Sequence, residues 1–148
     1  MNLKNLSVKI KIPKFFKDKL NNKRINLIYK KFEKSLNIKQ NFIVAVSGGP
    51  DSLALAFLTK VYALKNRLKP KFIIVDHKLR QESTREAKKV KNLLKKYSID
   101  LEILTWKGKK PKTNIQSLAR KKRYQLLIDK CHKLKIKNVL IAHHQDDL

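Results

Sequence analysis

A pair of glycines between an apolar run and a helical pattern constrains the fold of this chain more than any other feature. Residues 42–46 are apolar and partly β-branched, which predicts a buried strand. Residues 52–66 carry leucine and alanine at helical spacing. Between them, Gly48 and Gly49 lack Cβ atoms, so the backbone can adopt positive φ and lie close against a ligand. We therefore expect a strand, a tight turn and a helix.

This turn has the composition of a phosphate-binding loop. The first N–H groups of a helix lack intrahelical partners, and together with the helix dipole they attract anions. Asp51 adds a carboxylate that suits Mg²⁺ beside phosphate oxygens. The patterns G-x-x-x-x-G-K-[ST] and G-x-G-x-x-G are both absent, and the alternative is an ordinary glycine-rich turn. The residues expected to hold phosphate are Ser47, Gly48, Gly49, Pro50, Asp51 and Ser52.

Strand and helix patterns alternate along the rest of the chain. The predicted strands are residues 42–46, 71–75, 101–106 and 139–142. A capping-box pattern of Ser83 and Glu86 predicts the start of the second intervening helix, and Asn114 is expected to cap the third. Ile115 and Leu118 are expected on the buried face of that third helix. This alternation predicts an α/β fold with a doubly wound parallel sheet.

The N-terminal part precedes this pattern. Residues 1–40 are expected to form a basic arm and one helix over residues 14–36, and residues 41–148 the α/β domain. The length of 148 residues suits one domain. No apolar run approaches the ~18 residues of a membrane span, so no membrane partner is expected. The single cysteine fits a reducing cytoplasm, which is the expected location.

Charge is the most extreme feature of the composition. The chain has 37 basic and 11 acidic residues, a net charge of +26 and a pI near 10.3. Such a balance permits RNA binding, because phosphate neutralisation dominates that kind of association. The charge is spread along the whole chain and comes mostly from lysine, so it does not establish a partner. The single cysteine excludes an internal disulfide and a paired-cysteine metal site.

Polar residues follow the second predicted strand. In doubly wound sheets, ligands bind outside the carboxyl ends of the strands. Asp76 is therefore expected to contact a nucleotide, and His77 and Arg80 to contact a substrate. The alternatives are a polar cap on the strand end and an ordinary exposed turn.

The third helix begins at the same edge of the sheet. Asn114 and Arg120 are expected to contact substrate, since Arg120 lies roughly 9 Å into the helix and its side chain leans back toward the start. Arg123, one turn further, reaches the edge less easily. The alternative is a solvated basic face, which better explains Lys121 and Lys122.

The fourth strand is followed by histidines and carboxylates. His143 and His144 are expected to shape or hydrogen-bond a substrate site. Asp146 and Asp147 are expected to bind Mg²⁺ together with Asp51, because hard cations prefer oxygen ligands. The alternative is that one of the two aspartates caps a helix.

Taken together, these motifs resemble the tRNA(Ile)-lysidine synthetases, a branch of the PP-loop ATPases. The resemblance rests on residues 47–52, 75–80, 114–116 with 119–124, and 142–147. It implies a Rossmann-like fold of the adenine nucleotide alpha hydrolase type. In that family ATP adenylates the wobble cytidine of isoleucine tRNA with a CAU anticodon, and free lysine then displaces AMP to form lysidine. The implied cofactors are ATP and Mg²⁺, and the implied partners are that tRNA and lysine.

The resemblance also implies roles for individual residues. Residues 47–52 would cradle the phosphates, with Asp51 as a metal ligand. Asp146 and Asp147 would hold metal or the lysine amine. Arg120 would face the tRNA or the leaving phosphate. Catalytic roles are therefore expected for Asp51, Arg120, Asp146 and Asp147.

The chain departs from the family pattern at its end. Leu148 stands where the family has glutamine, so the domain is expected to be truncated at its C-terminus, with uncertain activity. One alternative function is that of another PP-loop enzyme such as a tRNA thiolase, although the lone Cys131 argues against the cytidine-thiolating type, which carries paired cysteines. The other alternative is a non-catalytic RNA-binding remnant.

Overall fold

The computed structural model describes residues 11–143, and residues 1–10 and 144–148 lie outside its description. Helices and strands alternate after two leading helices. In chain order the elements are α1 (Lys14–Leu20), α2 (Lys23–Ser35), β1 (Ile43–Ala45), α3 (Pro50–Asn66), β2 (Lys71–Asp76), α4 (Ser83–Lys95), β3 (Leu101–Thr105), α5 (Ile115–Leu134) and β4 (Val139–Ile141).

The strands form one parallel sheet in the order β3-β2-β1-β4. In the register, Val44 of β1 lies opposite Phe72 of β2 on one side and Leu140 of β4 on the other. In chain order, β2 and β3 are added on one side of β1, and β4 is then added on its other side. This reversal makes a topological switch point between β1 and β4. This arrangement confirms the predicted α/β fold with a doubly wound parallel sheet.

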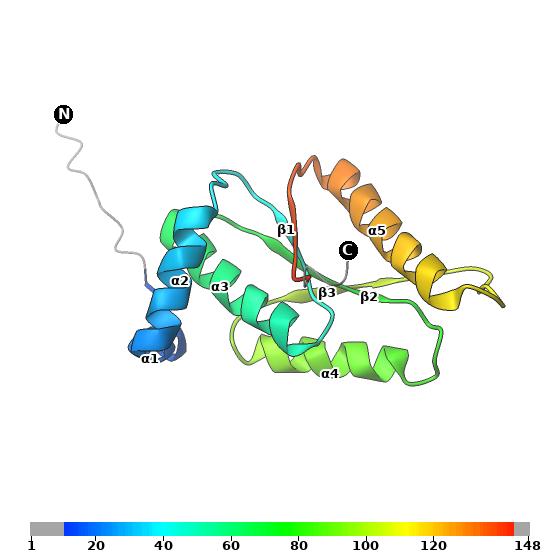
Figure 1. Cartoon of the computed structure of the whole chain (residues 1–148), viewed down its shortest axis with the longest axis horizontal. Coiled ribbons are helices and arrows are strands. Elements are labelled where there is room, and N and C mark those ends of the chain that lie inside the picture. Colours follow the sequence, from blue (N-terminus) through cyan, green and yellow to red (C-terminus); the bar gives the residue numbers. More distant parts are fainter. Residues whose placement is uncertain (1–10, 144–148) are drawn as a thin grey trace, which may run out of the picture.

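Each face of the sheet packs against its own helices. Helices α3 and α4 lie on one side of the sheet and α5 on the other (Figure 1). Successive residues of a strand point to opposite faces. Val44 accordingly joins the larger core, which includes residues of α3 and α4, whereas Ile43 packs in a smaller core with Leu127 and Cys131 of α5.

The leading segment contains two helices, so the expected single helix over residues 14–36 is wrong. The chain turns at Asn21 and Asn22, and Asn22 Oδ1 accepts hydrogen bonds from the main-chain N–H groups of Arg24 (3.0 Å) and Ile25 (3.2 Å). Asn22 is therefore an N-cap that starts α2. Both helices bury aromatic side chains in the larger core of the domain. The boundary expected at residue 40 stays a prediction.

Two local predictions about the helices are wrong: the capping box of α4 and the burial of Ile115 and Leu118 in α5. Helix α4 begins at Ser83 as expected but has no capping box: its N-cap is Glu82, and the Glu86 carboxylate pairs with Arg80 instead. Ile115 and Leu118 of α5 are 44% and 40% exposed, because they line surface hollows at the start of the helix rather than the core. Asn114 is the N-cap of α5 as expected, although it has a left-handed φ of 50° and its side chain makes no capping bond. None of the helices within residues 11–143 combines the length and apolar character needed to cross a membrane.

Candidate nucleotide site at the switch point

A hollow of about 680 Å³ opens at the carboxyl ends of β1 and β4. Its walls come from the turn after β1, the turn after β2, one face of α5 and the end of β4. Crevices at such switch points are where doubly wound sheets bind ligands. The structure brings together at this hollow most of the residues singled out in the sequence: Ser47, Gly49, Pro50, Asp51, Ser52, His77, Arg80, Arg120, Arg123 and His143.

The turn after β1 is organised by one buried hydroxyl. Ser52 is 3% exposed, and its Oγ accepts hydrogen bonds from the main-chain N–H groups of Ser47 and Gly48, both at 3.1 Å. The Ser47 hydroxyl also donates to Ser52 Oγ (3.1 Å), and Ser52 in turn donates to the carbonyl of Gly49 (3.0 Å). Ser52 therefore fixes the shape of the loop from inside, with its hydrogen-bonding capacity used within the protein.

Gly48 takes the backbone conformation that the sequence predicted for this turn. Its φ is +89°, and a Cβ atom built on it would lie 2.9 Å from Val90 Cγ2 of α4. Both facts require glycine there. Gly49 has φ −72° and is the N-cap of α3, and Pro50 follows in the first turn of that helix. The loop thus leads the chain tightly over α4 into the amino end of α3.

Asp51 is exposed in the first turn of α3 and lines the hollow. Asp146 and Asp147, which were expected to join it, lie outside the described residues. Within residues 11–143 no group of three His, Cys, Asp or Glu side chains could hold a metal ion. Mg²⁺ is commonly held by one or two carboxylates with phosphate oxygens and water. The single carboxylate of Asp51 beside the loop of residues 47–52 fits that manner of binding.

Asp76 lies at the end of β2 as expected, but its side chain is buried instead of open to the hollow. It is 2% exposed and accepts hydrogen bonds from Thr84 Oγ1 (2.6 Å), Ser83 Oγ (2.7 Å) and the main-chain N–H of Lys78 (3.0 Å). Burial by itself would raise the pKa of Asp76, but these hydrogen bonds and the charge of Lys78 outweigh it and keep that pKa below its ordinary value. Both carboxylate oxygens are thus used within the protein, and nucleotide contact by Asp76 stays a prediction. The carboxylate ties the start of α4 to the end of β2.

The turn after β2 presents His77 and Arg80 to the hollow. His77 Nδ1 accepts a hydrogen bond from the main-chain N–H of Leu79 (3.2 Å), so a neutral imidazole carries its proton on Nε2. Arg80 forms an exposed ion pair with Glu86 (2.9 Å). Exposed pairs of this kind contribute little stability, about 0–1 kcal/mol. Arg80 therefore stays available for an anionic ligand at small cost.

Helix α5 contributes two guanidinium groups on the opposite wall. Those of Arg120 and Arg123 lie 5.8 and 5.5 Å from the ring centroid of Tyr124. The Tyr124 hydroxyl lies 2.5 Å from His143 Nε2, which connects α5 to the end of β4. Arg123 Nε is buried without a hydrogen-bond partner among the described residues. An unpaired buried donor is costly, so this N–H is suited to an anionic ligand.

The lining of the hollow differs in part from the residues expected from the sequence, and some contacts around it were not expected. Asn114 is not part of the lining, whereas its neighbours Ile115 and Gln116 are. His144 lies outside the described residues. The roles of Ser83 and Thr84 as partners of Asp76 were missed, because that contact depends on how the turn after β2 folds back. Tyr124 was noted as part of a motif, but its bond to His143 joins residues 19 positions apart and no local pattern indicates it.

Comparison with known proteins identifies relatives of this chain. It is 44% identical over 110 residues to a tRNA(Ile)-lysidine synthase of Bartonella henselae, covering 73% of this chain and 22% of that protein. It is 35% identical over 127 residues to that of Rickettsia bellii, with 82% and 30% covered. The chain thus spans less than a third of the length of these curated relatives. They confirm the resemblance inferred from the motifs.

A solved structure and a family match agree with the fold. The U34-tRNA thiolase NcsA from Methanococcus maripaludis, solved with its [4Fe-4S] cluster, superimposes with a TM-score of 0.73 at 20% identity, over 85% of this chain and 48% of that one. At that identity the likeness concerns the fold alone. The sequence matches the PP-loop domain family over residues 17–148. With this match, the parallel sheet and the glycine turn at its switch point, the chain belongs to the PP-loop domain family.

Proposed function

We propose that this chain binds ATP with its phosphates at residues 47–52 and acts in lysidine formation on isoleucine tRNA with a CAU anticodon. One observation carries the proposal: the loop of residues 47–52 and the guanidinium groups of Arg120 and Arg123 line the same hollow. The family match and the named relatives support the chemistry assigned to it. Because tRNA, ATP and lysine occur together in the cytoplasm, the reaction is proposed to take place there.

Phosphate binding is assigned to the amino end of α3. Helix dipoles favour anions at this position by about 0.3–1 kcal/mol per charge, before any direct hydrogen bond. The internal bonds of Ser52 hold the loop in shape, so little ordering cost is expected on binding. Asp51 would hold Mg²⁺, alone or with Asp146 and Asp147, and the bound ion would neutralise charge on the phosphates.

The reaction consists of two displacements. The 2-carbonyl oxygen of the cytosine forms a bond to the α-phosphorus of ATP. The bond from that phosphorus to the bridging oxygen breaks, and pyrophosphate leaves. The neutral ε-amine of lysine then forms a bond to carbon 2, the bond from carbon 2 to the AMP oxygen breaks, and the amine loses a proton. Arg120 and the unpaired Nε of Arg123 would donate hydrogen bonds to the phosphate oxygens as charge shifts toward the leaving group.

The test is pyrophosphate release by the 148-residue chain, with ATP, tRNA and lysine each omitted in turn. The proposal predicts sustained release only when all three are present, and lysidine in nuclease digests of the tRNA by mass spectrometry. Asp51→Ala should reduce release while leaving the folded state intact. Release that needs tRNA but not lysine would contradict the proposal and favour a thiolase type of adenylation. No release at all would favour a non-catalytic RNA-binding role.

A further inference from the structure

A second hollow lies on the other side of α5. Its volume is about 470 Å³, and it is lined by three apolar side chains, one glutamine and four lysines. We call it the Trp106 hollow. The apolar residues are Trp106, Pro111 and Leu118, and the lysines are Lys109, Lys110, Lys121 and Lys122.

The segment that forms the Trp106 hollow carries only positive charge. Residues 106–125 include eight basic residues and no acidic residue. Within residues 11–143, the three salt bridges involve Lys65, Arg80 and Lys130, so none of the lysines of the Trp106 hollow is paired with a carboxylate. The positive potential there is therefore not cancelled by neighbouring side chains, and it favours a polyanion.

The hollow is held in shape by its own loop. Lys110 Nζ donates hydrogen bonds to the carbonyl oxygens of Trp106 (2.7 Å) and Gly108 (3.1 Å), and it lies 4.5 Å from the centroid of the Trp106 ring. The main-chain N–H of Trp106 donates to the carbonyl of Asp76 (2.9 Å), which ties the loop to β2. Lys110 is thus committed to the loop, while Lys109, Lys121 and Lys122 provide charge for a ligand.

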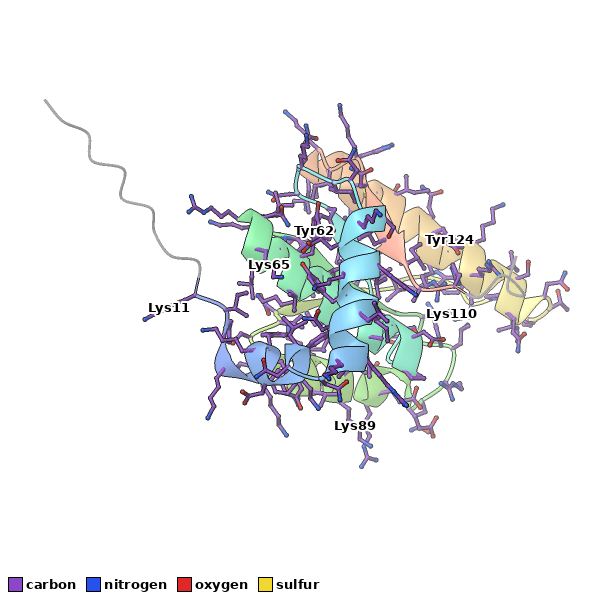
Figure 2. The ribbon with its side chains drawn as sticks, turned by 60° about the vertical axis from the view of Figure 1, so that its left-hand side comes forward. Lys11, Tyr62, Lys65, Lys89, Lys110 and Tyr124 are labelled. Carbon is purple, nitrogen blue, oxygen red and sulfur yellow. The ribbon has the colours of Figure 1, made fainter. Side chains whose placement is uncertain are left out.

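Helix α5 separates the two hollows. Arg120 and Arg123 line the candidate nucleotide site, whereas Lys121 and Lys122 line the Trp106 hollow. Figure 2 shows the labelled side chains of Lys110 and Tyr124 on the same side of the molecule, away from Lys11. Because neighbouring residues of one helix line the two hollows, a chain of phosphates lying across α5 at residues 120–123 would contact both.

We propose that the Trp106 hollow binds the phosphodiester backbone of the RNA whose nucleotide reacts at the switch-point site. The lysines neutralise phosphates, and the exposed Leu118 side chain offers an apolar surface to ribose or a base edge. The identity of that RNA rests on the proposed function, but the phosphate contacts themselves do not depend on its sequence. This assignment replaces the solvated face that the sequence indicated for Lys121 and Lys122.

The test compares two double variants that lose the same charge. Lys109→Gln with Lys121→Gln changes the Trp106 hollow, and Lys31→Gln with Lys34→Gln changes exposed lysines of α2. Affinities for isoleucine tRNA and for an unrelated RNA hairpin are measured by fluorescence anisotropy at several salt concentrations. The first variant should bind both RNAs roughly tenfold or more weakly at 0.1 M salt, with a log–log salt slope smaller by about 1.4–1.8 for two lost phosphate contacts. The α2 variant should retain the slope of the native chain.

A second readout comes from the chain itself. Trp106 is the single tryptophan, so its emission should change as RNA is added and saturate together with the anisotropy. Equal RNA binding by the two double variants would overturn the inference, as would the absence of RNA binding by the native chain. Polyglutamate serves as a competing polyanion. If it binds the native chain more tightly than RNA does, and if the first variant loses affinity for it, the hollow would be assigned to an acidic protein and the inference of RNA binding would be overturned. A third outcome separates this inference from the proposed function. If the first variant binds RNA more weakly than the α2 variant, but the native chain shows no lysine-dependent pyrophosphate release, this inference holds and only the proposed function is contradicted.

Discussion

The main-chain N–H of Gly48 donates a hydrogen bond to the side-chain oxygen of Ser52 over 3.1 Å. This bond links the only positive-φ residue of the loop over residues 47–52 to the first turn of α3. The loop therefore takes its shape from the helix that follows it, before any nucleotide arrives. Preorganisation of this kind reduces the entropy cost of binding.

Ser52→Ala should destabilise the folded chain by about 1–3 kcal/mol, because it leaves the N–H groups of Ser47 and Gly48 without their acceptor. Urea unfolding measures the change. The matched control is Ser35→Ala, which removes an exposed hydroxyl at the end of α2 and should cost less than about 0.5 kcal/mol. Equal effects of the two substitutions would show that Ser52 does not organise the loop.

Gly48→Ala should cost more stability than Gly108→Ala. Both glycines have positive φ, +89° and +105°, so each substitution carries about 1–3 kcal/mol of backbone strain. Only at Gly48 would the new Cβ meet another atom, Val90 Cγ2 at 2.9 Å. Overpacking of this kind adds about 1–3 kcal/mol. Urea unfolding should also show that Gly48→Ala costs less in a Val90→Ala background, and equal costs in both backgrounds would contradict the close approach.

Asp76→Asn should reduce the dependence of stability on pH. The pKa of Asp76 is lower in the folded chain than in the unfolded one, so its carboxylate stabilises the fold above the unfolded pKa of about 3.9. That contribution is lost as the pH falls through the lower, folded pKa. Urea unfolding between pH 7 and pH 2.5 should show a smaller loss in Asp76→Asn than in the native chain. Asp18→Asn, which removes an exposed carboxylate, serves as the control, and equal effects of the two substitutions would contradict this role of Asp76.

Arg123→Met should lower pyrophosphate release without lowering the stability of the folded chain. It removes a buried N–H that has no partner among the described residues, so the free energy of unfolding should stay the same or rise by up to about 1 kcal/mol. Under the proposed function, pyrophosphate release should fall at least tenfold, since a charge-assisted hydrogen bond to phosphate is lost. Thermal unfolding and the release assay measure both effects. A loss of several kcal/mol in stability would mean that Arg123 holds the fold instead.

The sheet and its order of elements were predictable because local patterns carry them. Short apolar or alternating patterns mark the strands, and helical spacing marks the segments between them. The position of the site followed from one rule about the carboxyl ends of parallel strands. The glycine at positive φ was also predictable, since Gly48 stands in a turn with apolar patterns on both sides.

What was missed depends on contacts distant in sequence or on a single side chain. Helical spacing identified the apolar face of α5, but not that Ile115 would line a hollow instead of the core. The break between α1 and α2 depends on one asparagine that caps the second helix, Asn22. Asp76 ends a strand at the expected edge, yet hydrogen bonds from α4 turn its carboxylate into a structural group.

The binding of ATP phosphates against residues 47–52 can be measured at the glycine amides. The chain has only three glycines, so selective ¹⁵N-glycine labelling gives one amide signal each for Gly48, Gly49 and Gly108. Titration with ATP and Mg²⁺, followed by ¹H–¹⁵N correlation spectra, reads the loop directly and has Gly108 as its internal reference. If ATP binds there, the Gly48 and Gly49 signals should shift saturably and the Gly108 signal should not move. Shifts confined to Gly108, or no shift at saturating ATP, would contradict binding at this loop.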